Sequence, residues 1–168
     1  MDPKLISEIA AEASRIEEDA LYSGRGHFEA AAAWSRAHYR LGIPTSVLAA
    51  VAGGSAIADN LTAAAIVGLV VTALSALSTF LNPSDRAHQH HAAGALFNEV
   101  RNQARVLRNV DLKTRSLDDT VIERLRTLGT ERDKLNKASP QIPRWAFRRA
   151  RKSIEAGEAA YALDSQAG

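Results

Sequence analysis

Three hydroxyl side chains in the middle of the sequence, Thr72, Ser75 and Thr79, recur at spacings of 3 and 4 residues. On an α-helix this spacing places them on one face, which Ala65 and Gly68 extend. A hydroxyl-bearing stripe on an apolar helix can line a water-filled pore. The hydroxyls can instead bond the carbonyl four residues back or a neighbouring helix. Ala65, Gly68, Thr72, Ser75 and Thr79 are therefore candidate pore-lining residues.

Small residues at four-residue spacing form a second pattern. Ala49 precedes Gly53, Ala64 precedes Gly68, and Gly54 follows directly on Gly53. Helices in lipid associate through close van der Waals contact, which small residues permit. Ala49, Gly53, Gly54 and Ala64 are therefore predicted helix-packing residues, either within one chain or also between copies in an oligomer.

Near the carboxyl end, Trp145, Arg148, Arg149 and Lys152 are spaced 3, 1 and 3 residues apart. On a helix this spacing places an aromatic ring and three cations on one side. Such a face can bind anionic lipid headgroups or a phosphate-bearing ligand. A solvated face paired with acidic neighbours is the alternative.

Other reactive residue types give weaker signals. His88, His90 and His91 could bind zinc or sense pH, but no third ligand stands at a suitable spacing, so a helix surface is the favoured interpretation. The chain has no cysteine, which excludes disulfides and thiolate chemistry. Phosphate-loop, nucleophile-elbow and dinucleotide-binding signatures are missing too. We therefore predict no catalytic, cofactor-binding or metal residues and no enzyme activity.

The hydroxyl and small-residue patterns lie in a long uncharged segment. From Leu41 to Leu81, Asp59 is the only side chain with a formal charge. A membrane-spanning helix needs about 20 apolar residues, so this segment is long enough for two crossings. Asp59 and Asn60 supply a polar break. The sequence predicts a hairpin of two transmembrane helices, residues 41–58 and 61–81.

Charges beside the hairpin set its orientation and the domain organisation. Arg36 and Arg40 precede the first span, Arg86 follows the second, and the turn has no cation. The positive-inside rule then places both termini in the cytoplasm. We expect amino-terminal cytoplasmic helices over residues 1–40, the hairpin over 41–81 and carboxy-terminal cytoplasmic helices over 82–168. The small net charge of +2 gives no reason to expect nucleic-acid binding.

Apolar residues in the flanks recur at helical spacing and nowhere alternate as in a strand. The amino-terminal helix should break at Ser23–Gly26, with a second helix from His27 to Arg40. Pro44 should stand near the start of a helix, where its missing N–H costs little. After the hairpin, Ser84 is the expected N-cap of a helix with Asp85 in its first turn. Further helices should open at Ser116, with Asp119 in a capping box, and run from about Arg144 to Ala162. The predicted fold class is all-α: a transmembrane hairpin with flanking cytoplasmic helices, in an oligomeric membrane protein. Partner subunits are expected to cover the apolar faces of the cytoplasmic helices.

Several short strings carry a resemblance to a known family. They are Trp34 before the membrane, Leu41-Gly42-Ile43-Pro44, Gly53-Gly54, Phe80-Leu81-Asn82-Pro83 and the segment His88 to Arg101. From Tyr22 to about Arg108 the chain resembles the SLATT family, two-transmembrane effector domains found beside nucleotide-signalling modules in bacterial conflict systems.

The resemblance implies an oligomer in the bacterial inner membrane that permeabilises it when a companion sensor or nucleotide-generating enzyme signals infection. It carries no ligand-binding residues over to this chain. A constitutive ion channel and a non-conducting membrane anchor remain as alternatives. Subunit number, ion selectivity and the gating signal do not follow from the sequence.

Overall fold

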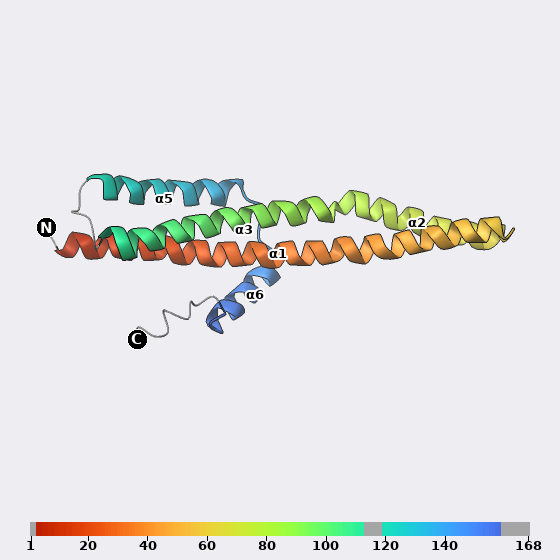
Figure 1. Cartoon of the computed structure of the whole chain (residues 1–168), viewed down its shortest axis with the longest axis horizontal. Coiled ribbons are helices and arrows are strands. Elements are labelled where there is room, and N and C mark those ends of the chain that lie inside the picture. Colours follow the sequence, from red (N-terminus) through yellow and green to blue (C-terminus); the bar gives the residue numbers. More distant parts are fainter. Residues whose placement is uncertain (1–2, 113–118, 159–168) are drawn as a thin grey trace. The chain divides into compact units, whose positions relative to one another are not determined.

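The computed structural model describes residues 3–112 and 119–158, and all the regular elements among them are helices. They are α1 (Pro3–Ile57), α2 (Leu61–Leu81), α3 (Pro83–Val106), the π-helical turn η1 (Leu107–Asp111), α5 (Asp119–Ala138) and α6 (Arg144–Glu155) (Figure 1). The predicted all-α class is confirmed for this part of the chain. The expected helix start at Ser116 and the stretch 159–162 of the expected last helix lie outside the described residues.

The predicted break at Ser23–Gly26 is wrong, because α1 continues through it as one helix of 55 residues. Its glycines instead permit close packing. A Cβ on Gly24 would meet the carbonyl oxygen of Gly94 and the Cβ of Phe97 at 3.4 Å, and one on Gly26 would meet Ile142 at 3.1 Å. Close tertiary packing at these two positions therefore outweighs the low helix propensity of glycine.

Pro44 also lies inside α1 and not near a helix start as expected. Its missing N–H removes one hydrogen bond from the helix. In the same turn the hydroxyl of Thr45 donates to the carbonyl of Leu41 at 2.6 Å, and that of Ser46 to Gly42 at 3.0 Å. The first apolar span is thus the last part of a helix that begins in the polar flank.

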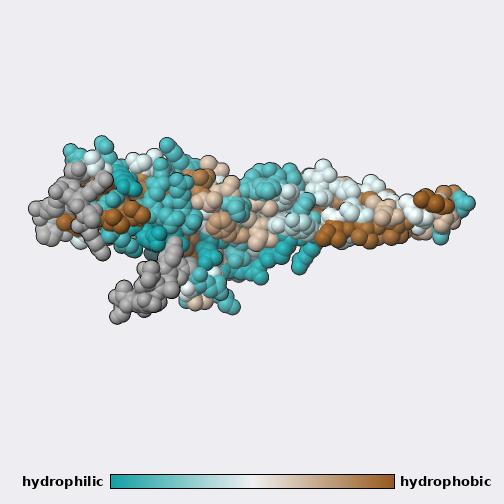
Figure 2. Space-filling view, in the orientation of Figure 1, coloured by the Kyte–Doolittle hydropathy of each residue, from teal (hydrophilic) through white to brown (hydrophobic). Residues whose placement is uncertain are grey.

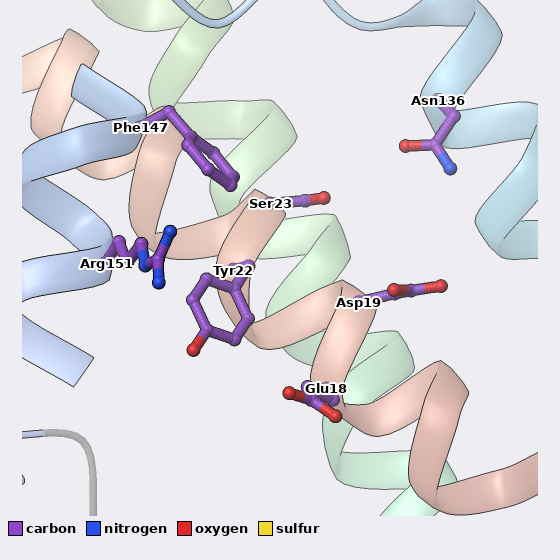
Figure 3. A pocket seen from close by; sticks show the side chains of 7 residues that line it. All are labelled: Glu18, Asp19, Tyr22, Ser23, Asn136, Phe147 and Arg151. Atoms are coloured by element: carbon purple, nitrogen blue, oxygen red, sulfur yellow. The ribbon is translucent and has the colours of Figure 1, made fainter. Parts of the chain in front are cut away.

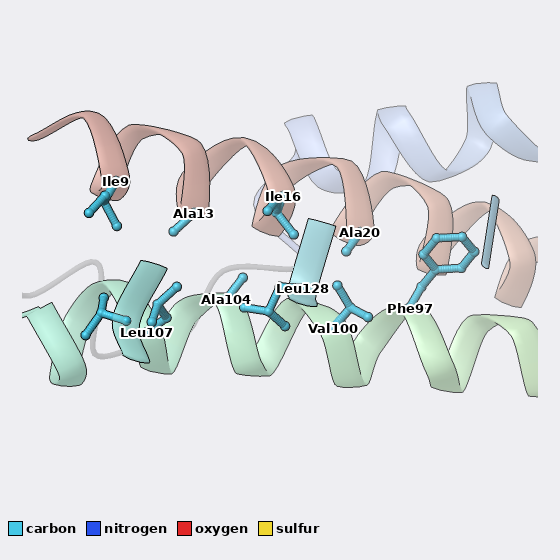
Figure 4. Close-up of a cluster of buried hydrophobic side chains, with 10 residues drawn as sticks. Ile9, Ala13, Ile16, Ala20, Phe97, Val100, Ala104, Leu107 and Leu128 are labelled. Atoms are coloured by element: carbon cyan, nitrogen blue, oxygen red, sulfur yellow. The ribbon is translucent and has the colours of Figure 1, made fainter. Parts of the chain in front are cut away.

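The chain divides into two compact units, residues 1–30 with 89–168 and residues 31–88. The first unit contains a helical bundle whose core is contributed by α1, α3 with η1, and α5 (Figure 4). The core residues are Ile9, Ala13, Ile16, Ala20, Phe97, Val100, Ala104, Leu107, Val121 and Leu128. The stripes on α3 and α5 predicted to await partner subunits are thus covered by the chain itself.

The second unit contains the hairpin of α2 and the end of α1. A turn at Ala58 and Asp59 joins them, and Asp59 adopts a positive φ of 55°, which Asp tolerates better than most residues. Asn60 caps α2, because its side-chain Oδ1 accepts from the N–H of Ala63 at 3.2 Å. The helix predicted for the second span has the expected bounds, Leu61 and Leu81, and the helix that contains the first ends at Ile57 and not at 58.

Two long helices, Lys4–Ile57 and Leu61–Asp111, contain windows apolar enough to cross a membrane, and none of either window is buried. With a rise of 1.5 Å per residue, α2 alone is about 30 Å long, close to the thickness of a hydrocarbon core. The apolar surface of the hairpin therefore suits lipid as its solvent.

The junction after α2 differs from the expected one. Asn82 ends α2 in the left-handed conformation with φ 42°, and its N–H donates to the carbonyl of Ser78. Pro83 is the first residue of α3, a position where a proline costs no hydrogen bond. Ser84 is therefore inside the helix and is not its N-cap, whereas Asp85 lies in the first turn as predicted.

Candidate functional site

The two helices of the hairpin meet along a seam of partly covered side chains. In α1 these are Leu41, Thr45, Leu48, Ala52 and Ser55, and in α2 they are Ala64, Val67, Val71, Leu74, Ser78 and Leu81. Their alternating spacings of 3 and 4 are those of antiparallel helices packed along one stripe. The seam uses only one face of each helix, so the remaining faces determine what the hairpin can do.

One exposed face of α2 carries the predicted pore-lining residues. Ala65, Thr72, Ser75 and Thr79 are exposed, and Gly68 is partly covered at the edge of the seam. A matching stripe of small residues follows on α1, at Gly42, Ser46, Ala49 and Gly53. Viewed from the N-terminus of its own helix, each stripe is rotated from the seam in the same sense. Because the two helices are antiparallel, this rotation brings both stripes to the same side of the hairpin. We call this the small side.

The opposite side of the hairpin carries large apolar residues, and we call it the bulky side. These are Ile43, Val47 and Val51 on α1 and Ile66, Leu69, Val70, Leu77 and Phe80 on α2, which are between 44% and 84% exposed. Figure 2 shows the hairpin with pale residues along one edge and strongly hydrophobic ones along the other. The hairpin thus presents two chemically different surfaces.

Not all the predicted packing residues lie in the seam. Ala64 does, whereas Ala49, Gly53 and Gly54 are exposed. A Cβ added to Gly53, Gly54 or Gly68 would meet nothing within 4 Å. Packing of the hairpin on itself therefore does not explain these glycines. Ala49 and Gly53 belong to the small side, where they leave room for a close approach by another helix.

The hydroxyls of the small side differ in their hydrogen bonds. Thr72 donates from Oγ1 to the carbonyl of Gly68 at 2.9 Å, the local bond common for hydroxyls in apolar helices. Its oxygen can still accept a hydrogen bond. Ser75 and Thr79 have no hydrogen-bond partner among the described residues. The small side therefore offers polar groups that a single hairpin does not use.

A cation and an aromatic ring meet beside the apolar segment. The Cζ atom of Arg86 lies 5.0 Å from the centroid of the Trp34 ring, within range of a cation–π interaction. The Nε of Arg86 also donates to the carbonyl of Leu81 at 2.9 Å. The residues expected to mark the cytoplasmic boundary thus contact one another.

His90 is buried, so its predicted place on a helix surface is wrong. Only 4% of its surface is exposed, and its Nδ1 lies 2.9 Å from the Nδ1 of His27 on α1, which is 2% exposed. The ring of Phe97 stacks on that of His27 at 5.5 Å. His88 and His91 are exposed as expected. Sequence reasoning missed His27, because a single histidine in a helix predicts no partner. Among the described residues, no group of three His, Cys, Asp or Glu side chains could hold a metal ion.

The predicted aromatic and cationic face lies on α6. Ala146 and Ala150 are fully buried there, while Trp145, Arg148, Arg149 and Lys152 are exposed. Since the two alanines lie on the opposite side of the helix, α6 packs through its small residues and presents its cations outward.

The first unit also has a pocket of about 530 Å³ between α1, α5 and α6 (Figure 3). Glu18, Asp19 and Tyr22 of α1 line it together with Phe147 and Arg151 of α6. Asp19 is already paired with Arg132 at 3.1 Å, and Arg151 with Glu155 at 2.7 Å. Two of its three charged groups are thus neutralised within the chain.

Comparison with known proteins agrees with this layout of an exposed apolar hairpin between polar helices. Searches of curated proteins and of solved structures find no significant match. A family model, described as SMODS and SLOG-associating 2TM effector domain family 4, matches residues 17–165, which is most of the chain. The chain therefore belongs to the SLATT family of two-transmembrane effector domains.

Proposed function

We propose that copies of this chain assemble in the bacterial inner membrane into a pore that permeabilises it in an antiphage conflict system. Family membership supports an effector with two transmembrane helices. In this proposal the chain is not an enzyme and binds no nucleic acid. Both termini are cytoplasmic, and a nucleotide-signalling enzyme or sensor supplies the trigger.

The observation that carries the proposal is the difference between the two sides of the hairpin. Large apolar side chains gain most from contact with lipid tails, whereas small residues allow helices to approach closely. The bulky side therefore faces lipid, and the small side faces other copies. Because one hairpin of two helices cannot enclose a conduit, several copies are needed to surround one.

In such an assembly α2 lies nearest the axis. Its small side carries the hydroxyls of Thr72, Ser75 and Thr79, whereas the small side of α1 is dominated by glycine and alanine. Hydroxyls lower the cost of wetting a narrow apolar passage. The small residues of α1 then form the contact with the neighbouring copy.

The test compares substitutions on the two sides of α2. Thr72→Leu or Ser75→Leu should reduce ion flux in reconstituted bilayers and toxicity on overexpression while assembly persists, since an apolar constriction resists wetting. Gly68→Leu should disturb assembly by holding helix backbones apart. The matched control is Val70→Leu on the bulky side, which should change neither ion flux nor assembly.

Two outcomes would replace the proposal. If crosslinking in membranes yields only monomers, or Thr72→Leu and Ser75→Leu leave the flux unchanged, the chain is a membrane anchor. If the purified protein conducts fully without any companion protein or signal, it is a constitutive channel.

A further inference from the structure

The cationic face of α6 is unusual because most of its charges have no neutralising partner in the part of the chain that the structure describes. Of the basic side chains on this helix, Arg151 pairs with Glu155 at 2.7 Å. Arg144, Arg148, Arg149 and Lys152 form no hydrogen bond or ion pair within residues 3–112 and 119–158. Four like charges within three turns repel one another, so an external anion beside them would relieve this repulsion.

A pocket adjoins this face. It has a volume of about 460 Å³, and Arg144 and Arg148 line it together with Ile142 and Phe147. Two guanidinium groups one helical turn apart can hold phosphate oxygens through paired N–H donors. The two apolar walls suit the uncharged part of the same molecule. The pocket thus fits an amphiphile with an anionic head.

Trp145 indicates the kind of environment that this face of α6 contacts. It shares a helix face with the four cations and is 40% exposed. An indole ring is favoured at the level of lipid headgroups, where its apolar body and its N–H both find partners.

We infer that the face formed by Arg144, Trp145, Arg148, Arg149 and Lys152 binds anionic phospholipid headgroups. The chain carries two membrane-spanning helices, so a leaflet is always present at high effective concentration. Anionic lipids attract basic clusters beside a membrane anchor. This surface differs from the small side of the hairpin, and its function does not depend on whether the hairpin conducts.

The experiment uses the full chain in lipid nanodiscs with Trp145 as the reporter. The chain has two tryptophans, so Trp34→Phe leaves Trp145 as the only indole. One nanodisc contains phosphatidylcholine alone and the other about one third phosphatidylglycerol, each with a nitroxide-labelled headgroup lipid as quencher. Quenching of Trp145 should be at least roughly twofold stronger in the anionic nanodisc and should fall in about 0.5 M salt.

Charge-reversed variants give the matched comparison. Arg148→Glu with Arg149→Glu should reduce quenching to the level in phosphatidylcholine. Arg126→Glu with Lys134→Glu changes the net charge equally at exposed positions of α5 and should leave quenching unchanged. All four residues are exposed, and circular dichroism checks that helix content is retained.

Three results would overturn the inference. Equal quenching in both nanodiscs shows that the leaflet charge is not recognised. If Arg126→Glu with Lys134→Glu on α5 reduces quenching equally, quenching responds to the net charge of the protein alone. If inorganic phosphate shifts the Trp145 emission in phosphatidylcholine nanodiscs and anionic lipid does not, the face binds a soluble phosphate compound.

Discussion

His27 on α1 and His90 on α3 form a buried pair, with their Nδ1 atoms 2.9 Å apart and their ring centroids 5.2 Å apart. One imidazole must donate its N–H to the ring nitrogen of the other, so at least one of the facing Nδ1 atoms is unprotonated. If both rings were protonated, two cations would face each other in the core. The helix interface therefore disfavours a pair in which both rings are protonated.

The first prediction is that the folded bundle loses stability in mild acid. Burial, and next the charge of His90, lower the pKa of His27 from 6.5 to about 4. The unfolded chain then binds more protons between these two values, so stability is complete above about pH 6.5 and declines as the pH falls to about 4. The whole shift corresponds to roughly 3 kcal/mol.

Thermal unfolding of the detergent-solubilised protein at several pH values measures this effect. His27→Phe should flatten the pH dependence, although it also lowers stability at neutral pH because His90 loses a partner. The control, His88→Phe, changes an exposed histidine and should retain the wild-type slope. An unchanged slope in His27→Phe would show that other groups cause the acid sensitivity.

The hairpin was predictable because its signal is a long absence of charge, which depends on no distant contact. Helix α2 is confirmed from Leu61 to Leu81. That the first span continues a helix beginning at Pro3 was not predicted, since α1 passes from polar to apolar sequence without a break. The small side could not be predicted from the sequence, because residue spacing alone does not say which face of a helix its partner covers. It could be identified only once the structure showed the seam.

The errors in the flanks have a common physical cause. Gly24 and Gly26 indicated a loop by local propensity, but contacts with α3 and with Ile142 hold them inside a helix. The His27–His90 pair joins residues 63 positions apart, and no local pattern reports such a pairing. The π-helical turn at Leu107–Asp111 was missed too, and its buried Asp111 pairs with Arg124 at 2.6 Å. Local signals thus predicted elements, and tertiary contacts determined their continuity.

The second prediction concerns two glycines that should respond oppositely to alanine. A Cβ on Gly94 would lie 3.0 Å from Cε1 of Phe28, so the aromatic ring would have to shift. One on Gly129, within α5, would meet nothing within 4 Å. Gly129→Ala should therefore stabilise the protein by about 1 kcal/mol through helix propensity. Gly94→Ala should lower stability despite the same gain, by about 1–3 kcal/mol of overpacking.

Each glycine serves as the control for the other, since the chemical change is identical and both positions are helical. Thermal unfolding in one detergent and buffer gives the two shifts. A rise in melting temperature for Gly94→Ala would mean that α1 and α3 can separate slightly without cost.

The third prediction is the orientation of the hairpin. The native chain has no cysteine, so single substitutions report accessibility directly. Ala58→Cys lies in the exposed turn and leaves the Asn60 cap intact, and Ser7→Cys is exposed in the first unit. An impermeant maleimide added to intact cells should label the first and not the second, because the cations near the spans stay in the cytoplasm. The reverse pattern would invert the orientation.

The last prediction is that the small side faces the axis of an assembly. Identical residues of neighbouring copies approach one another only near a symmetry axis. Disulfides need Cα atoms about 4.4–6.8 Å apart. When membranes are treated with an oxidant, the Thr72→Cys variant should therefore form disulfide-linked dimers on non-reducing gels. Two control variants should stay largely monomeric: Leu74→Cys, which lies in the seam, and Leu69→Cys, which lies on the bulky side. If Leu69→Cys is linked as efficiently as Thr72→Cys, the bulky side and not the small side joins the copies, and the hydroxyls of α2 face away from any conduit.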